Sequence, residues 1–112
     1  MFLVHPSQAD AHVYTDYLTS VPSDIQVFGI NSYNLHHLQN PLTSIEALAQ
    51  FYIKALKQVQ GDGPYQLGGW SLGGVIAFEM AQQLSQQGMT VAQLILIDSW
   101  VFDMDYYESE LY

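Results

Sequence analysis

The 112-residue sequence has no cysteine, no arginine and only two lysines. Without cysteine, the chain cannot form a disulfide framework, a thiolate metal site or a cysteine nucleophile. Eleven acidic residues give a formal charge of −9, which disfavours binding to nucleic acid or to an anionic membrane surface. The chain also lacks a basic leader and a long apolar run. We therefore expect no secretory signal, no membrane span and a cytoplasmic location.

Short apolar runs alternate with amphipathic segments along the rest of the chain. The runs at 2–5, 25–30, 65–69 and 91–97 predict strands, the last apolar enough to be covered on both faces. Helices are expected over about 11–18, from the capping-box pair Thr43 and Glu46 to about 60, and from Val75 to Leu84, ending at Gly88. This alternation predicts an α/β fold with one parallel sheet and right-handed crossovers.

Functional residues in such sheets gather at the carboxyl ends of the strands. The residues of this chain that fall there are Ser7, His36, His37, Ser71 and Asp98. Among them, Ser71 lies in Gly69-Trp70-Ser71-Leu72-Gly73, a Gly-x-Ser-x-Gly pattern with a strand before it and a helical pattern after it. That context is typical of a nucleophile elbow, where the serine sits on a strained bend with its hydroxyl exposed. The flanking glycines then avoid collisions with the neighbouring strand and helix.

A serine nucleophile needs a base and two backbone N–H donors that face the developing oxyanion. In elbow enzymes one donor follows the serine, which here is Leu72. The loop after the first strand offers Ser7 as the second donor, with Gln8 as the next candidate. Asp98, at the end of the strand after the elbow helix, either orients the base or serves as an ordinary turn or capping aspartate.

The base is the missing part, because all four histidines precede Ser71. We expect His5 to be packed at a strand end and His12 to lie at the surface. The adjacent pair His36 and His37 is expected to be solvated in a polar loop, and it lacks further ligands at metal-site spacing. A base role for His36 or His37 in an unusual arrangement stays open as an alternative.

Residues 63–81 strongly resemble the elbow of the thioesterase domains that end non-ribosomal peptide and polyketide synthetases. The resemblance continues at Gln87-Gly88 and at 94–99, with its terminal Asp-Ser, and more weakly at 2–6. These domains are α/β-hydrolases that release an acyl or peptidyl chain from the phosphopantetheine arm of a carrier protein and need no cofactor of their own. The resemblance implies that Ser71 is the nucleophile, Asp98 the triad acid, and Leu72 and Ser7 the oxyanion donors.

The sequence departs from the family in two places. The family often has glycine soon after His-Pro, whereas this chain continues Ser7-Gln8-Ala9-Asp10. The family's histidine lies far downstream, beyond a helical lid, in a domain about twice this long. The resemblance therefore makes residues 1–112 the N-terminal half of an α/β-hydrolase domain, without the lid and C-terminal part. It implies four parallel strands flanked by helices, in the order 25–30, 2–5, 65–69, 91–97.

These expectations have consequences for activity and association. Without its histidine the chain should be a poor catalyst, since a missing triad histidine costs about a millionfold in turnover. The strand 91–97 would lie at an exposed edge, which favours aggregation or swapped dimers. Two other functions remain open: another serine esterase or lipase of the same fold, or a non-catalytic remnant that docks a carrier protein. The negative charge argues against the remnant, because carrier proteins are usually acidic too.

Overall fold

The computed structural model describes residues 1–100 and Glu108. Its elements, in chain order, are β1 (Phe2–Val4), the 3₁₀ helix η1 (Ala11–Ser20), β2 (Phe28–Ile30), the 3₁₀ turn η2 (Asn34–His36), α1 (Ile45–Val59), β3 (Tyr65–Trp70), α2 (Leu72–Gln86) and β4 (Val91–Ile97). No helix in this described part is long and apolar enough to cross a membrane.

The four strands form one parallel sheet in the order β2-β1-β3-β4, which confirms the predicted topology. The strand predicted over 25–30 is shorter than expected and begins only at Phe28. The Ile25 N–H donates to the Pro22 carbonyl, 3.1 Å away, so a turn occupies the start of the predicted strand. The Phe28 N–H then donates to the Met1 carbonyl at 2.8 Å, where pairing with the first strand begins.

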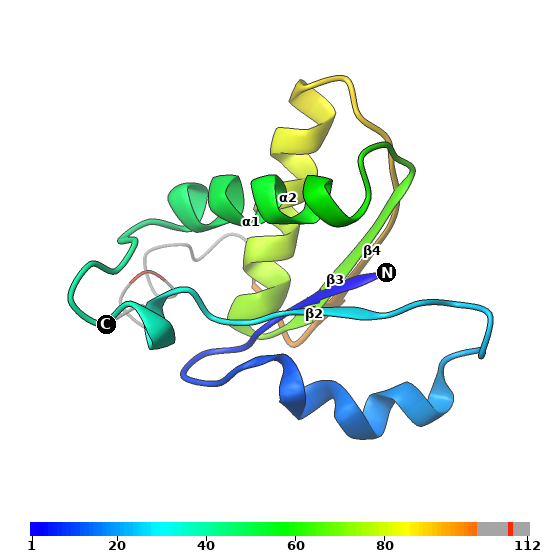
Figure 1. The fold of residues 1–112 in the computed structure, drawn as a ribbon, viewed down its shortest axis with the longest axis horizontal. Coiled ribbons are helices and arrows are strands. Elements are labelled where there is room, and N and C mark those ends of the chain that lie inside the picture. Colours follow the sequence, from blue (N-terminus) through cyan, green and yellow to red (C-terminus); the bar gives the residue numbers. More distant parts are fainter. Residues whose placement is uncertain (101–107, 109–112) are drawn as a thin grey trace.

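Helices cover the two faces of the sheet unequally (Figure 1). The helices α1 and α2 pack on one face, and their apolar sides form the core with β1 and β3. On the other face η1 packs mainly against β1 and β2, and it reaches the end of β3 through Tyr14. It is a 3₁₀ helix of which only Tyr14 is buried, whereas Val13, Tyr17 and Leu18 are exposed.

The helix α1 begins with Ser44 as its N-cap, so the prediction that Thr43 fills this position was wrong. The Ser44 backbone is extended, and its hydroxyl accepts a hydrogen bond from the Ala47 N–H at 3.1 Å. Ser44 therefore stands three residues before the donor that an N-cap side chain satisfies. Glu46 still lies in the first turn, where a negative charge favours the helix N-terminus.

The strand β4 forms one edge of the described sheet and has no fully buried residue. Its composition predicted cover on both faces. Instead, Leu94 packs partly against the core, while Leu96 and Ile97 remain exposed. Within residues 1–100 and Glu108, no helix covers the second face of this strand. An apolar strand is thus left at an open edge, as the sequence led us to expect.

Candidate active site

Ser71 lies at a sharp bend between β3 and α2. Its φ of 54° and ψ of −121° lie outside the regions that non-glycine residues normally occupy. The flanking glycines fit the bend as predicted. A Cβ on Gly69 would overlap the backbone of Gly73, and a Cβ on Gly73 would overlap the Val4 carbonyl oxygen. The segment therefore has the strand, turn and helix that a nucleophile elbow requires.

Hydrogen bonds to the end of β4, to Ser99 just beyond it and to Tyr14 of η1 hold this bend in place. The Ser71 N–H donates to the Ile97 carbonyl at 2.8 Å, and the Ser99 hydroxyl donates to the Ser71 carbonyl at 2.8 Å. On the other side, the Tyr14 hydroxyl accepts from the Trp70 N–H at 2.8 Å and donates to the Val4 carbonyl at 2.5 Å. The supporting roles of Tyr14 and Ser99 were not predicted, because both depend on contacts between distant parts of the chain.

The backbone N–H groups proposed for the oxyanion lie on the two segments that flank Ser71. Leu72 is the first residue of α2, and its N–H has no acceptor within the helix. Ser7 follows β1, the strand that pairs with β3. Among the described residues, the Ser7 N–H makes no backbone hydrogen bond. Both N–H groups are therefore available to an incoming group.

The loop after β1 takes a glycine-like bend although it contains no glycine. Gln8 has a positive φ of 55°, a left-handed conformation that glycine adopts most easily. The departure from the family pattern at Ser7-Gln8-Ala9-Asp10 is thus a change of residue at a position that still bends. Gln8, which was the second candidate for the oxyanion donor, is exposed.

Asp98 directly follows β4 and has a positive φ of 50°. In the sheet register Trp70 pairs with Ile97, so Ser71 and Asp98 leave neighbouring strands at the same edge. Asp98 is exposed, and no hydrogen bond joins its side chain to Ser71 within the described residues. The structure therefore brings the two residues to one edge of the sheet without a direct hydrogen bond between them.

Three of the four histidines are exposed. His12 lies on η1, and the His36 Nε2 is 2.9 Å from the Asp10 carboxylate. Desolvation alone would raise the pKa of the Asp10 carboxyl, but hydrogen bonds from the Ser32 N–H and from His36 hold this pKa below its ordinary value. His37 stacks on Tyr33 with ring centroids 3.8 Å apart. None of these contacts involves Ser71 or Asp98.

His5 is buried, as predicted, and is only 3% exposed. Its Nδ1 lies 2.9 Å from the Pro6 carbonyl oxygen, and its Nε2 lies 2.8 Å from the Tyr52 hydroxyl. The same hydroxyl accepts a hydrogen bond from the Tyr33 N–H at 2.9 Å. Burial lowers the pKa of His5 and raises the pKa of Tyr52 to about 12, so both are neutral at pH 7.

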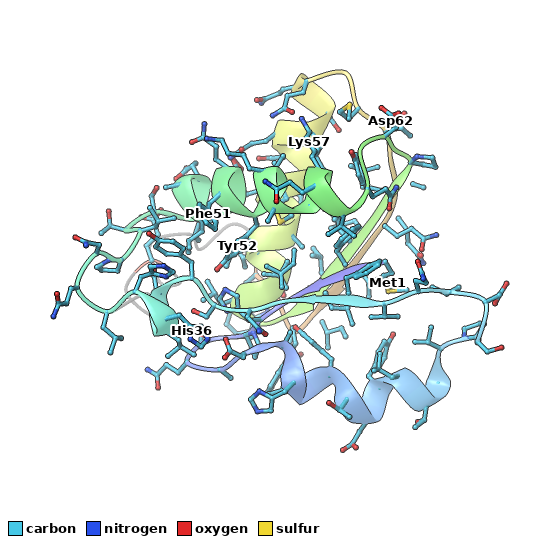
Figure 2. All side chains as sticks on the ribbon, in the orientation of Figure 1. Met1, His36, Phe51, Tyr52, Lys57 and Asp62 are labelled. Carbon is cyan, nitrogen blue, oxygen red and sulfur yellow. The ribbon has the colours of Figure 1, made fainter. Side chains whose placement is uncertain are left out.

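An apolar cavity of about 370 Å³ lies between β2 and α1, away from the elbow. Its walls include Phe28, Tyr33, Phe51 and Tyr52, but neither Ser71 nor Asp98. Figure 2 shows Phe51 and Tyr52 on α1, facing the segment that carries His36. Residues 1–100 and Glu108 contain no cluster of three or more His, Asp or Glu side chains that could hold a metal ion.

Comparison with known proteins agrees with this geometry. The family model of the thioesterase domain matches residues 1–108. The chain is 47% identical over 83 residues to the non-reducing polyketide synthase crz7 of Cladonia metacorallifera, covering 73% of this chain and 4% of the synthase. It is 33% identical over 100 residues to a dimodular nonribosomal peptide synthase of Bacillus subtilis, covering 89% and 4%.

Solved structures give the same result. The NocB thioesterase domain from the nocardicin cluster superposes with a TM-score of 0.82 at 34% identity, covering 88% of this chain and 44% of that one. A four-domain nonribosomal peptide synthetase, AB3403, gives the same TM-score at 32% identity, with 8% of its length covered. This chain thus spans less than half of the NocB domain and a small part of each synthase. Its sheet and helices are those of an α/β-hydrolase, and the chain belongs to the thioesterase domain family.

Proposed function

We propose that this chain is the nucleophile-bearing, N-terminal half of a thioesterase domain that releases an acyl or peptidyl chain from a carrier protein. The observation that carries the proposal is the strained backbone of Ser71, at a bend whose glycines admit no side chain. A bend of this kind exposes a serine hydroxyl beside free N–H groups. Membership of the thioesterase domain family supports a thioester as substrate.

The proposed reaction begins with attack of the Ser71 hydroxyl oxygen on the thioester carbonyl carbon while a base takes the hydroxyl proton. The Leu72 and Ser7 N–H groups stabilise the resulting oxyanion. Collapse breaks the carbon–sulfur bond, and the phosphopantetheine thiolate leaves with the proton from the base. Water, or an amine or hydroxyl of the bound chain, then attacks the acyl-serine and releases an acid or a ring.

We propose that the base is a histidine outside residues 1–112, oriented by Asp98. Two observations support this. None of the four histidines present contacts Ser71 or Asp98 among the described residues, and the chain spans 44% of the NocB domain. The exposed apolar strand β4 fits the same proposal, because further parts of a domain would cover it. Reading the coding DNA beyond codon 112 tests this part, and a stop codon there would contradict it.

The nucleophile is tested by covalent labelling of the protein that carries this chain. The NocB thioesterase domain forms a covalent complex with a fluorophosphonate analog of nocardicin G, so a fluorophosphonate is a suitable probe. We expect one adduct, on the peptide containing Ser71, and none in Ser71→Ala. Ser85→Ala, on the same helix but away from the bend, is the matched control and should label normally. Labelling that persists in Ser71→Ala would refute the assignment.

The substrate class and partner are tested by turnover. Pantetheine thioesters should be hydrolysed or cyclised faster than simple esters of the same acyl group, and turnover should be faster still on a loaded carrier protein. Activity confined to simple esters would assign the chain to another serine hydrolase. Carrier binding without turnover, unchanged in Ser71→Ala, would show a docking role alone. A cytoplasmic location also stays a prediction, which cell fractionation would check.

A further inference from the structure

The hydrogen bonds of His5 determine which of its two ring nitrogens carries the proton. The Pro6 carbonyl can only accept, so the His5 Nδ1 must carry the hydrogen that fills the 2.9 Å contact. In a neutral imidazole the Nε2 is then an acceptor, and the Tyr52 hydroxyl must donate to it across 2.8 Å. The Tyr52 oxygen still has a lone pair for the Tyr33 N–H. Every polar atom of this buried chain of contacts has a partner.

This arrangement fixes the peptide that joins Pro6 to Ser7. Among residues 1–100 the cis peptide bond is Gly63–Pro64, so the Pro6–Ser7 bond is trans. In a trans peptide the carbonyl and the N–H point in opposite directions. A hydrogen bond that holds the Pro6 carbonyl toward the buried imidazole therefore turns the Ser7 N–H outward from the core.

The start of this loop lies directly against the elbow. A Cβ built on Gly73, in the first turn of α2, would be 2.6 Å from the His5 carbonyl oxygen. Rotation of the Pro6–Ser7 peptide would consequently move the Ser7 N–H relative to the helix end that carries Leu72. The imidazole is anchored to α1 through Tyr52, so the position of the peptide is set by the core rather than by the exposed loop.

We propose that His5 is a positioning residue for the oxyanion site: its Nδ1–H holds the Pro6 carbonyl and so directs the Ser7 N–H toward the substrate oxygen. This inference rests on the function proposed above and adds to it a residue that does not touch the substrate. A filler role in the core would require only the ring's volume, and a phenyl ring would supply that. The positioning role requires a donor at the Nδ1 position.

Two variants separate these roles. In His5→Asn the side-chain amide nitrogen falls near the Nδ1 position and can donate to the Pro6 carbonyl. In His5→Gln the side-chain amide oxygen can fall near the Nε2 position and accept from the Tyr52 hydroxyl, so that contact is kept and the Pro6 carbonyl loses its donor. Both variants lose one buried hydrogen bond, so their losses of stability should be similar.

Turnover of a pantetheine thioester by the protein that carries this chain should distinguish the two variants. Losing one oxyanion donor lowers kcat by about 10²–10³-fold, so a misdirected donor in His5→Gln should lower kcat by about 10–100-fold. We expect kcat of His5→Asn to stay within about 3-fold of the unsubstituted protein, and KM to change little in either variant. Equal losses of kcat, or a larger loss in His5→Asn, would overturn the proposal. If the unsubstituted protein shows no Ser71-dependent turnover, the proposed function fails, and the role of His5 in it fails too.

The proton position can be measured without any variant or activity. Two-dimensional ¹⁵N–¹H spectra of the imidazole ring of this chain at pH 7.5 should show His5 as the Nδ1–H tautomer. The exposed His12 provides an internal reference for a solvated ring. An Nε2–H tautomer for His5 would overturn the proposal even if both variants failed to fold.

Discussion

Replacing Gly73 by alanine should destabilise the fold far more than an ordinary glycine substitution in this chain. The new Cβ would overlap the Val4 carbonyl oxygen and lie 2.6 Å from the His5 carbonyl oxygen and 3.0 Å from the Val4 carbonyl carbon. These are backbone atoms of β1 and the residue after it, so no flexible side chain can move aside. The first turn of α2 must shift instead, and this would disturb the helix end that carries Leu72.

The expected cost follows from the kind of clash. Overpacking a core usually costs about 1–3 kcal/mol, and a clash against paired strand backbone belongs at the upper end, about 3 kcal/mol or more. For a domain of this size that corresponds to a fall in Tm of about 10–20 °C. Gly61→Ala is the matched control, because its Cβ would meet only the Lys57 carbonyl oxygen at 4.0 Å. Its free energy of unfolding should change by about 0.5 kcal/mol or less.

The measurement is equilibrium unfolding in urea, followed by far-ultraviolet circular dichroism and by fluorescence of the two tryptophans. If Gly73→Ala unfolds at the same urea concentration as the unsubstituted chain, the close approach of α2 to β1 is wrong. A loss as large in Gly61→Ala would equally refute the reasoning, since it would show that any added methyl group destabilises the chain.

Three further predictions concern the residues around the site. Gln8→Gly should raise the free energy of unfolding by about 1 kcal/mol, because a left-handed backbone costs a non-glycine residue about that much. The control Ala9→Gly, at a residue without a positive φ, should lower it. The reverse order of the two variants in urea unfolding would contradict the left-handed conformation of Gln8. Tyr14→Phe should cost about 2 kcal/mol, since it leaves the Val4 carbonyl and the Trp70 N–H without the hydroxyl; Tyr17→Phe, at an exposed ring, should cost almost nothing, and equal losses in thermal melts would argue against the bridge. Tyr52 has an ordinary pKa of 10 that folding raises to about 12. Its contribution to the free energy of unfolding is therefore complete below pH 10 and is lost as the pH rises toward 12, by up to about 3 kcal/mol. Tyr52→Phe should lose stability less steeply than the unsubstituted chain over this pH range, and an equally steep loss would contradict the reasoning.

Local patterns in the sequence were enough to predict most of the fold. Apolar runs bounded by turn residues located all four strands, and the three-residue to four-residue spacing located α1 and α2, because these signals depend only on neighbouring residues. The errors lie at boundaries. The choice of Ser44 over Thr43 as N-cap depends on one hydrogen bond that either neighbouring hydroxyl could have made. The late start of β2 at Phe28 follows from the turn in which the Ile25 N–H donates to the Pro22 carbonyl.

Some features of the candidate site could likewise be predicted from local sequence, and others could not. The elbow around Ser71 could be predicted from five residues, since glycine is needed where a side chain would collide with nearby backbone. The hydrogen bonds that support this elbow could not be predicted in this way. Tyr14 reaches Trp70 across 56 positions and His5 reaches Tyr52 across 47, so both contacts exist only after the sheet and α1 have packed. The bend at Gln8 was hidden for a different reason, because a non-glycine residue occupies a position where glycine would have signalled it.

The central claim is that Ser71 accepts the acyl group from a thioester. Its most direct test is to mix the protein that carries this chain with an acyl-phosphopantetheine thioester, quench within seconds, and map the added mass by peptide mass spectrometry. We predict one acyl adduct, on the Ser71 hydroxyl, with release of an equal amount of free thiol. Thiol release without any acyl-serine, or an adduct that persists in Ser71→Ala, would contradict the account.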